Sequence, residues 1–174
     1  TLALPAAAFD LQGHRGARGL APENTLAAFA KALAIGVTTL ETDLAVTRDG
    51  VVVIAHDPDL NPALVREGGA WLKDRGPPIR SLTLAELQRY DVGRIDPESR
   101  YGRQWPQQAA SDGERIPTLA ALFELAGRTA RPVRFNLETK ITPTSGERTP
   151  DAEAFARAAV DAVQRAGMTS RTTI

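Results

Sequence analysis

The fold of this chain is decided by residues 13–57, which read GHRGARGLAPENTLAAFAKALAIGVTTLETDLAVTRDGVVVIAHD. This stretch contains both histidines of the sequence, His14 and His56, and between them an acidic pair, Glu41 and Asp43. Its hydrophobic residues first recur at helical spacing and later alternate, as they do in a strand. We therefore expect a turn, a helix and a pair of strands that gather these polar residues at one place.

A short strand over residues 9–12 is expected to lead into the turn. The helix is predicted to follow Asn24, which is a favourable N-cap residue. Leu26, Phe29 and further apolar residues then fall at helical spacing. Gly36 suits the C′ position at which a helix ends.

The acidic pair belongs to a strand predicted over residues 38–47. Leu40 and Leu44 share one face of this strand, and Glu41 and Asp43 share the other, because successive side chains of a strand alternate.

A hairpin is predicted to return the chain from this strand, because Asp49-Gly50 is a strong turn signal. The return strand spans residues 51–55. If residues 48–49 form a two-residue loop, the numbers of paired residues sum to 97 and His56 faces Glu41. If residues 49–50 form it, the sum is 99 and His56 faces Asp43. Either register would place His56 beside the acidic pair.

Residues 58–116 change in composition and are rich in proline, glycine and charge. Thr83 and Glu86 have the spacing of a capping box, which predicts one short helix. We interpret the span as an insertion that forms a functional lid or binding loop. A tolerated surface insertion is the alternative.

The remaining chain continues the alternation of helices and strands. A helix starting at Pro117-Thr118 is followed by a strand over residues 132–140. A second helix spans residues 150–166, with Pro150 at N1 and Gly167 at C′. Residues 171–174 are expected to start another strand, so the pattern is that of an α/β protein cut partway through.

The overall composition is that of a soluble globular domain, with 174 residues, 43% hydrophobic and 24% charged. The formal net charge is zero, so no general attraction to nucleic acid is expected. No apolar run approaches the ~20 residues that span a bilayer. Residues 1–8 are either the tail of a signal peptide or an extended entry into the first strand. The first interpretation would favour a periplasmic or secreted protein over a cytoplasmic one.

The acidic pair is the first candidate for chemistry. Two carboxylates on a core-facing strand repel each other and lose hydration, and a bound divalent cation removes that conflict. Oxygen ligands favour Mg²⁺, Ca²⁺ or Mn²⁺. A solvated outward face is the alternative for Glu41 and Asp43.

His56 is a candidate general acid or base beside such a cation, and Asp57 could orient its imidazole. The alternative is a histidine that only caps the hairpin. Arg15 can make a bidentate contact with a phosphate, and Gly16 allows close approach of the backbone. The alternative for His14-Arg15-Gly16 is an ordinary turn.

The strand over residues 132–140 carries a second polar face, with Arg134, Asn136, Glu138 and Lys140. We expect this strand to be buried on both sides, so that its polar face needs partners. Glu138 would then be a third carboxylate ligand, and Lys140 would offer a positive charge to an anion. A solvated face is again the alternative.

Together these residues resemble the glycerophosphodiester phosphodiesterase family. The matching motifs occur in the family's order: His14-Arg15-Gly16, Pro22-Glu23-Asn24-Thr25, Glu41-Thr42-Asp43, Thr47-Arg48-Asp49-Gly50, His56-Asp57 and Leu137-Glu138-Thr139-Lys140. The resemblance is closest over residues 9–57 and 117–141.

The resemblance implies a TIM-type (β/α) barrel with an insertion after the hairpin. The family's ligands of a divalent cation, Ca²⁺ or Mg²⁺, fall on Glu41, Asp43 and Glu138. Its general acid and base fall on His14 and His56, and its phosphate contacts fall on Arg15 and Lys140. The implied reaction hydrolyses a small-molecule glycerophosphodiester to glycerol 3-phosphate and an alcohol, through a cyclic phosphate made by the substrate's own hydroxyl.

The length departs from the family pattern. A complete barrel needs about 250 residues and eight strands. We therefore expect residues 1–174 to be one incomplete barrel domain with an insertion at about 58–116. The sequence leaves the alcohol, the metal and the oligomeric state open.

Three other interpretations are compatible with the sequence. A phospholipase D-like enzyme acting on lysophospholipids or sphingolipids would use Trp71, Tyr90, Tyr101 and Trp105 as a lipid-facing surface. A binding protein could keep the fold without the chemistry. A metal-dependent sugar isomerase is disfavoured by the phosphate-suited Arg15 and Lys140.

Overall fold

The computed structural model describes residues 9–174, so the expectation for residues 1–8 lies outside the described part of the chain. The longer elements are α1 (Leu26–Ile35), β2 (Thr39–Val46), α3 (Leu119–Gly127), β6 (Arg134–Thr139) and α4 (Ala152–Arg165). The shorter elements are β1 (Gln12–His14), β3 (Val52–Ile54), β4 (Arg66–Glu67), β5 (Ala70–Trp71), α2 (Leu84–Leu87), β7 (Thr172–Thr173) and the 3₁₀ turns η1 (Ile79–Ser81), η2 (Gly102–Gln104), η3 (Gly146–Arg148) and η4 (Thr169–Arg171).

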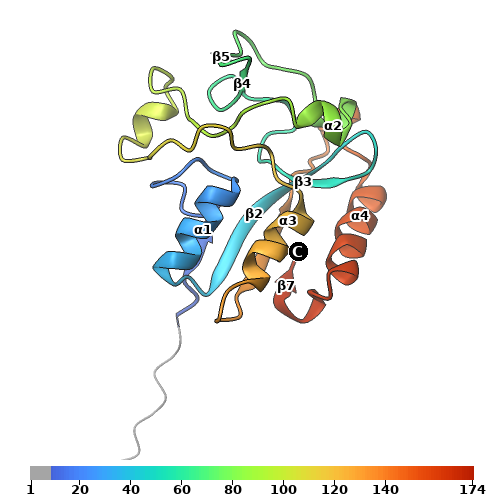
Figure 1. The fold of residues 1–174 in the computed structure, drawn as a ribbon. Coiled ribbons are helices and arrows are strands. Elements are labelled where there is room, and N and C mark those ends of the chain that lie inside the picture. The colour runs from blue at the N-terminus through green and yellow to red at the C-terminus, as the bar shows by residue number, and fades with distance from the viewer. Residues whose placement is uncertain (1–8) are drawn as a thin grey trace, which may run out of the picture.

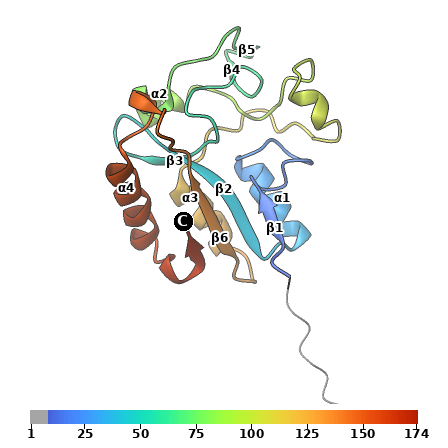
Figure 2. The same cartoon turned by 180° about the vertical axis from the view of Figure 1, so that it is seen from behind.

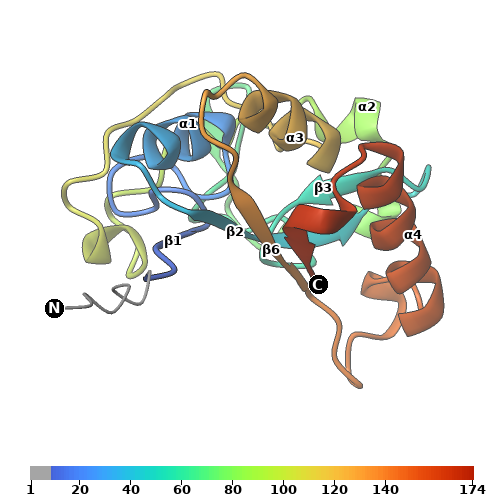
Figure 3. The ribbon, with the colours of Figure 1, turned by 90° about the horizontal axis from the view of Figure 1, so that it is seen from below.

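One sheet organises the described residues. Its parallel strands lie in the order β1-β2-β6-β7, and β3 pairs antiparallel with β2. The helices α1, α3 and α4 pack on one face of this sheet, and the span between β3 and α3 lies over the carboxyl ends of the strands (Figures 1 and 3). The predicted α/β class and the parallel sheet are confirmed. Closure of the sheet is not seen within residues 9–174.

The main hydrophobic core lies between the sheet and the helices. Leu40 and Leu44 of β2 are fully buried there, together with Phe29 of α1 and Phe155 of α4. The opposite face of β2 carries Glu41 and Asp43. The predicted division of β2 into an apolar and an acidic face is therefore confirmed, and Figure 2 shows the face of the sheet that the helices leave uncovered.

Two predicted helix starts were wrong by one or two residues. The N-cap of α1 is Thr25, whose hydroxyl accepts a hydrogen bond from the N–H of Ala28, and not Asn24. Asn24 has a positive φ of 57°, which takes it out of the capping geometry and frees its amide for other contacts. The N-cap of α4 is Asp151, so Pro150 precedes the cap and is not at N1. Both helices end at glycines with positive φ, as predicted.

The hairpin register also differs from both predicted registers. Leu44 pairs with Ile54 and Val46 pairs with Val52, so the paired numbers sum to 98. The loop is wider than two residues because side-chain hydrogen bonds of Thr47 close it, one to Asp49 at 2.6 Å and one from the N–H of Val51 at 2.9 Å. His56 follows β3 after a single residue, Ala55, and that residue's N–H donates to the carbonyl of Asp43 at 3.0 Å. His56 thus still lies near the acidic pair.

The expectation that the strand over residues 132–140 is buried on both sides was wrong. In β6, Phe135 and Leu137 are buried, while Arg134 and Glu138 are exposed. The cause is that α1, α3 and α4 all cover the same face of the described sheet. The polar face of β6 is accessible as a result.

The insertion, residues 58–116, builds a small core of its own against β3. Leu60, Val65, Ile79 and Leu87 are buried there with Val53 of β3. The predicted capping box at the start of α2 is confirmed.

The lipid-facing surface that the phospholipase D-like alternative requires is not observed within residues 58–116. Its four aromatic residues are half-buried, and within residues 58–116 no large hydrophobic side chain is exposed. In the described part of the chain, no helix combines the length and hydropathy that crossing a bilayer requires.

Candidate metal and phosphate site

Three carboxylates converge on the uncovered face of the sheet. Parallel pairing of β2 with β6 places Asp43 opposite Glu138, and Glu41 lies two residues earlier on the same face of β2. One ligand oxygen from each of the three residues lies within 4.8 Å of the others. Asp43 is completely buried and Glu41 is nearly so. The three predicted metal ligands are therefore brought together.

This donor set fits a hard divalent cation. Oδ1 of Asp43 is buried and accepts no hydrogen bond within the described residues, and the Nζ of Lys140 approaches it only to 3.6 Å. Burial raises the pKa of Glu41, and the neighbouring carboxylates Asp43 and Glu138 raise it further, against the opposing effect of the Arg15 N–H. An ion held by these carboxylate oxygens would satisfy Oδ1 of Asp43 and offset the repulsion.

Lys140 lies at the edge of this cluster. Its Nζ is 2.8 Å from Oε1 of Glu138 and 3.6 Å from Oδ1 of Asp43. The hydrogen bond from Lys140 is the main reason that the pKa of Glu138 lies below its usual value. The side chain is 22% exposed, so the ammonium is also within reach of a ligand from solvent.

Arg15 is held from both its backbone and its side chain. Its N–H donates to the carbonyl and to Oε2 of Glu41, at 3.0 and 2.8 Å. Its Nη1 donates to Glu23 at 2.8 Å, and its Nε lies 3.2 Å from Oδ2 of Asp43. The residue adopts a φ of 56°, a strained conformation for a residue other than glycine. The guanidinium is thus oriented before any phosphate arrives.

His14 lies beside the same carboxylates, at the end of β1 and in register with Glu41. Its Nε2 is 3.8 Å from Oε2 of Glu41, and its Nδ1 is 3.0 Å from a guanidinium nitrogen of Arg18. Burial, followed by the charges of Arg18 and Arg15, lowers the pKa of His14. The ring is half exposed and can meet a substrate.

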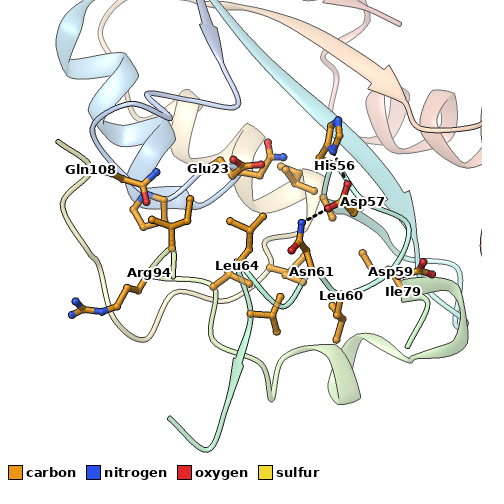
Figure 4. A pocket seen from close by; sticks show the side chains of 18 residues that line it. Glu23, His56, Asp57, Asp59, Leu60, Asn61, Leu64, Ile79, Arg94 and Gln108 are labelled. Carbon is orange, nitrogen blue, oxygen red and sulfur yellow. Dashed lines mark hydrogen bonds and ion pairs between the residues drawn. The ribbon is translucent and has the colours of Figure 1, made fainter. Parts of the chain in front are cut away.

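His56 is held by its neighbour in the sequence. Its Nδ1 lies 2.8 Å from Oδ1 of Asp57, and Asn61 donates to the other oxygen of Asp57 at 2.6 Å (Figure 4). The predicted contact of Asp57 with the imidazole is confirmed. Burial raises the pKa of Asp57, but the hydrogen bonds with His56 and Asn61 outweigh it and lower the pKa overall.

No ion pair links His56 to the three carboxylates within residues 9–174. His56 nevertheless directly follows Ala55, whose N–H donates to the carbonyl of Asp43 at 3.0 Å, which places it beside the strand that carries the acidic pair. Beside His56, a cavity of about 50 Å³ separates the insertion from residues 22–24 (Figure 4).

Sequence reasoning missed the roles of Glu23 and Asn24. Both are buried, and Asn24 donates to Oδ2 of Asp43 at 2.9 Å while it accepts from Thr42 at 2.9 Å. A signal was present, because asparagine is one of the few residues that tolerate a left-handed turn. Asparagine also suits a helix N-cap, so the sequence alone does not distinguish the two roles of Asn24.

Comparison with known proteins shows which family this chain is similar to. A family model described as the glycerophosphoryl diester phosphodiesterase family matches residues 14–174. A glycerophosphodiester phosphodiesterase from Caldanaerobacter subterraneus is 36% identical over 114 residues, which are 66% of this chain and 39% of the relative. One from Bacillus subtilis is 30% identical over 133 residues, or 75% of this chain and 40% of the relative. The chain thus spans less than half the length of these relatives.

Solved structures extend the likeness to the fold. A protein from Silicibacter pomeroyi, assigned to the glycerophosphoryl diester phosphodiesterases, is similar with a TM-score of 0.88 and 37% identity, over 97% of this chain and 57% of that one. A phosphodiesterase from Oleispira antarctica, solved with the product sn-glycerol-3-phosphate, has a TM-score of 0.59 and 28% identity, over 90% of this chain and 52% of that one. The parallel sheet with its outer helices corresponds to part of the TIM-type barrel of this family.

Proposed function

The chain belongs to the glycerophosphoryl diester phosphodiesterase family, and we propose that the protein hydrolyses glycerophosphodiesters to glycerol 3-phosphate and an alcohol. The observation that carries this proposal is the convergence of Glu41, Asp43 and Glu138 within 4.8 Å. Two further groups that suit a phosphate, Arg15 and Lys140, contact the same carboxylates. The site therefore combines carboxylate ligands for a divalent cation with cationic side chains for the phosphate that would bind next to it.

Glu41, Asp43 and Glu138 would hold a divalent cation, Ca²⁺ or Mg²⁺. This assignment is supported by Oδ1 of Asp43, which is buried and accepts no hydrogen bond among the described residues. When bound, the cation supplies positive charge that stabilises the oxygens of the phosphodiester as negative charge develops on them.

Arg15 and Lys140 would bind the phosphate of the substrate. Glu23 and Asp43 orient the guanidinium of Arg15 so that little motion is needed on binding. Lys140 is a point charge on a flexible stem, and a phosphate would draw its ammonium away from Glu138. Both cations offset the charge that makes a phosphodiester a poor electrophile.

His14 and His56 would move the protons. In the first step a hydroxyl of the substrate's glycerol attacks the phosphorus, one histidine accepts its proton, and the other donates a proton to the departing alcohol. In the second step water opens the resulting cyclic phosphate, and the two histidines exchange roles. Asp57 would keep the imidazole of His56 in place through both steps.

The test follows glycerol 3-phosphate released from glycerophosphocholine by the complete gene product in the presence of Ca²⁺ or Mg²⁺. We expect His14→Ala and His56→Ala each to lower kcat by about 10²-fold or more, the usual size of general acid–base effects. Glu41→Gln should abolish turnover, while Glu153→Gln, on the exposed face of α4, should not. Lysophosphatidylcholine is assayed in parallel for the release of choline, because its cleavage leaves the acylated glycerol phosphate. Turnover of that substrate alone would replace the proposal with the phospholipase D-like alternative, and cation binding without turnover of either substrate would favour the binding protein.

A further inference from the structure

One segment of the insertion is fastened to the loop that carries Arg15. The side chain of Gln108 donates to the carbonyl of Arg18 at 2.7 Å, and the N–H of Ala109 donates to the carbonyl of Leu20 at 3.0 Å. The guanidinium of Arg18 also lies over the ring of Trp105, 4.5 Å from its centroid. Residues 101–109 therefore pack against the loop that carries Arg15, although they follow it by about 80 positions in the chain.

Tyr101 links this segment to Glu23 and Arg18 of the loop through its hydroxyl. Its hydroxyl donates a hydrogen bond to Oε2 of Glu23 and accepts one from Arg18 at 3.3 Å. Its ring packs edge-on against Trp105, with centroids 6.4 Å apart. The phenol is therefore held by contacts on its ring and on its oxygen.

Glu23 divides its two carboxylate oxygens between two partners. Oε2 accepts from Tyr101, while Oε1 accepts from Nη1 of Arg15 at 2.8 Å. The Glu23 side chain is 5% exposed, so water cannot readily replace either partner. Burial and the hydrogen bond with the Glu23 carboxylate raise the pKa of Tyr101, in keeping with a phenol that donates to this carboxylate.

We propose that Tyr101 is a positioning residue of the phosphate site, which acts through Glu23 to fix the orientation of the Arg15 guanidinium. This inference rests on the function proposed above. Without the phenolic hydroxyl, Oε2 of Glu23 would be buried with one donor fewer. The carboxylate would then be free to rotate, and Arg15 would lose the fixed partner that directs it toward the substrate.

The consequence is a defined role for the insertion. Its aromatic residues in the segment 101–109 serve to brace a catalytic loop, which agrees with their half-buried side chains and does not require contact with lipid. Tyr101 itself makes no hydrogen bond with His14 or with the three carboxylates among the described residues. Its hydroxyl has two partners, Glu23 and Arg18, and Arg18 lies 3.0 Å from Nδ1 of His14, so a test must separate the route through Glu23 to Arg15 from the route through Arg18 to His14.

A double-mutant cycle on the complete gene product tests this route. Tyr101→Phe removes the hydroxyl and keeps the ring, and Arg15→Ala removes the group through which Tyr101 is said to act. Tyr90→Phe is the matched control, because Tyr90 is another half-buried tyrosine of the insertion. The readouts are kcat/KM for glycerophosphocholine, the dissociation constant of sn-glycerol 3-phosphate, and the Tm of each variant.

We expect Tyr101→Phe to lower kcat/KM and product affinity by about tenfold, the scale of a hydrogen bond to a charged group. The same change in the Arg15→Ala background should have an effect below about twofold, because coupled residues are not additive. Equal effects in both backgrounds, or an effect no larger than that of Tyr90→Phe, would overturn the inference. A wild-type protein that neither hydrolyses the diester nor binds the product would overturn the proposed function and this inference together, whereas an active wild type without coupling would overturn the inference alone.

Discussion

The side-chain amide of Asn24 donates a 2.9 Å hydrogen bond to Oδ2 of Asp43, a carboxylate without exposed surface. This bond joins the loop before α1 to the centre of β2. Asn24 also accepts a hydrogen bond from Thr42 at 2.9 Å, and its φ of 57° is one that few residues adopt without strain. One amide thus contributes two hydrogen bonds between the loop that carries Arg15 and the strand that carries the acidic pair, in addition to the contacts of Arg15 with Glu41 and Asp43.

Replacement of Asn24 should destabilise the protein through two separable effects. Asn24→Gly removes the amide but accepts the positive φ, and we expect it to lower the free energy of unfolding by about 1–3 kcal/mol, because a buried carboxylate loses a donor. Asn24→Ala should cost about 1–2 kcal/mol more, because alanine is strained at this φ. Denaturant unfolding measures both, with Asn136→Ala on the accessible face of β6 as the control. Equal stability of Asn24→Gly and wild type would contradict the importance of the bond.

Gly16 packs against the start of α1 so closely that no side chain fits. A Cβ at this position would lie 2.7 Å from the backbone carbon of Ala28, and φ is 77°. Gly36 has a φ of 94°, and a Cβ added there would meet nothing within 4 Å. A substitution at Gly36 therefore costs only the strain of a positive φ and causes no steric clash. Gly36→Ala should therefore destabilise by about 1 kcal/mol, and Gly16→Ala by clearly more. Thermal unfolding of the two variants checks the order, and the reverse order would be incompatible with the close packing.

Asp57 should contribute stability that is lost in acid. Its pKa is lowered in the folded protein, so the carboxylate stabilises the fold above the pKa of an unfolded aspartate, about 3.9. This contribution disappears as the pH falls from there through the lower folded value. Between about pH 5 and 3, wild type should lose more stability than Asp57→Asn does. Denaturant unfolding across this range is the measurement, and Asp74→Asn, at an exposed position, should behave as wild type.

Lys140 should compete with a cation for the carboxylates. Its ammonium lies 3.6 Å from Oδ1 of Asp43, where a second positive charge would be repelled. Lys140→Met should therefore bind Ca²⁺ or Mg²⁺ several-fold more tightly while it loses turnover, because the phosphate contact is gone. Calorimetric titration of the metal-stripped variant tests this, with Lys73→Met at an exposed position as the control. Weaker cation binding by Lys140→Met would show that the ammonium supports the metal site.

Much of the site could be predicted because it depends on local periodicity. The alternation in residues 40–44 alone placed Glu41 and Asp43 on the face away from the helices, and the parallel register with β6 then brought Glu138 opposite Asp43. The hairpin register could not be obtained in this way. It depends on hydrogen bonds from the side chain of Thr47, which close a wider loop than the Asp-Gly signal indicates.

The parts that were missed depend on contacts between distant segments. Tyr101 meets Glu23 across 78 positions of the chain, and no local pattern predicts such a pair. The burial of β6 was overestimated for a related reason, since strand composition does not reveal how many faces the helices cover. The role of Asn24 is hidden in the sequence because an N-cap and a left-handed turn favour the same residue type.

The most direct test of the metal and phosphate site is a cation titration of the metal-stripped complete gene product. The rate of glycerol 3-phosphate release from glycerophosphocholine is measured as Ca²⁺ or Mg²⁺ is added. We predict no release without the cation, a saturable return of activity with it, and no return in Glu41→Gln. Full activity of the stripped protein, or unchanged activation of Glu41→Gln, would contradict a cation held by Glu41, Asp43 and Glu138.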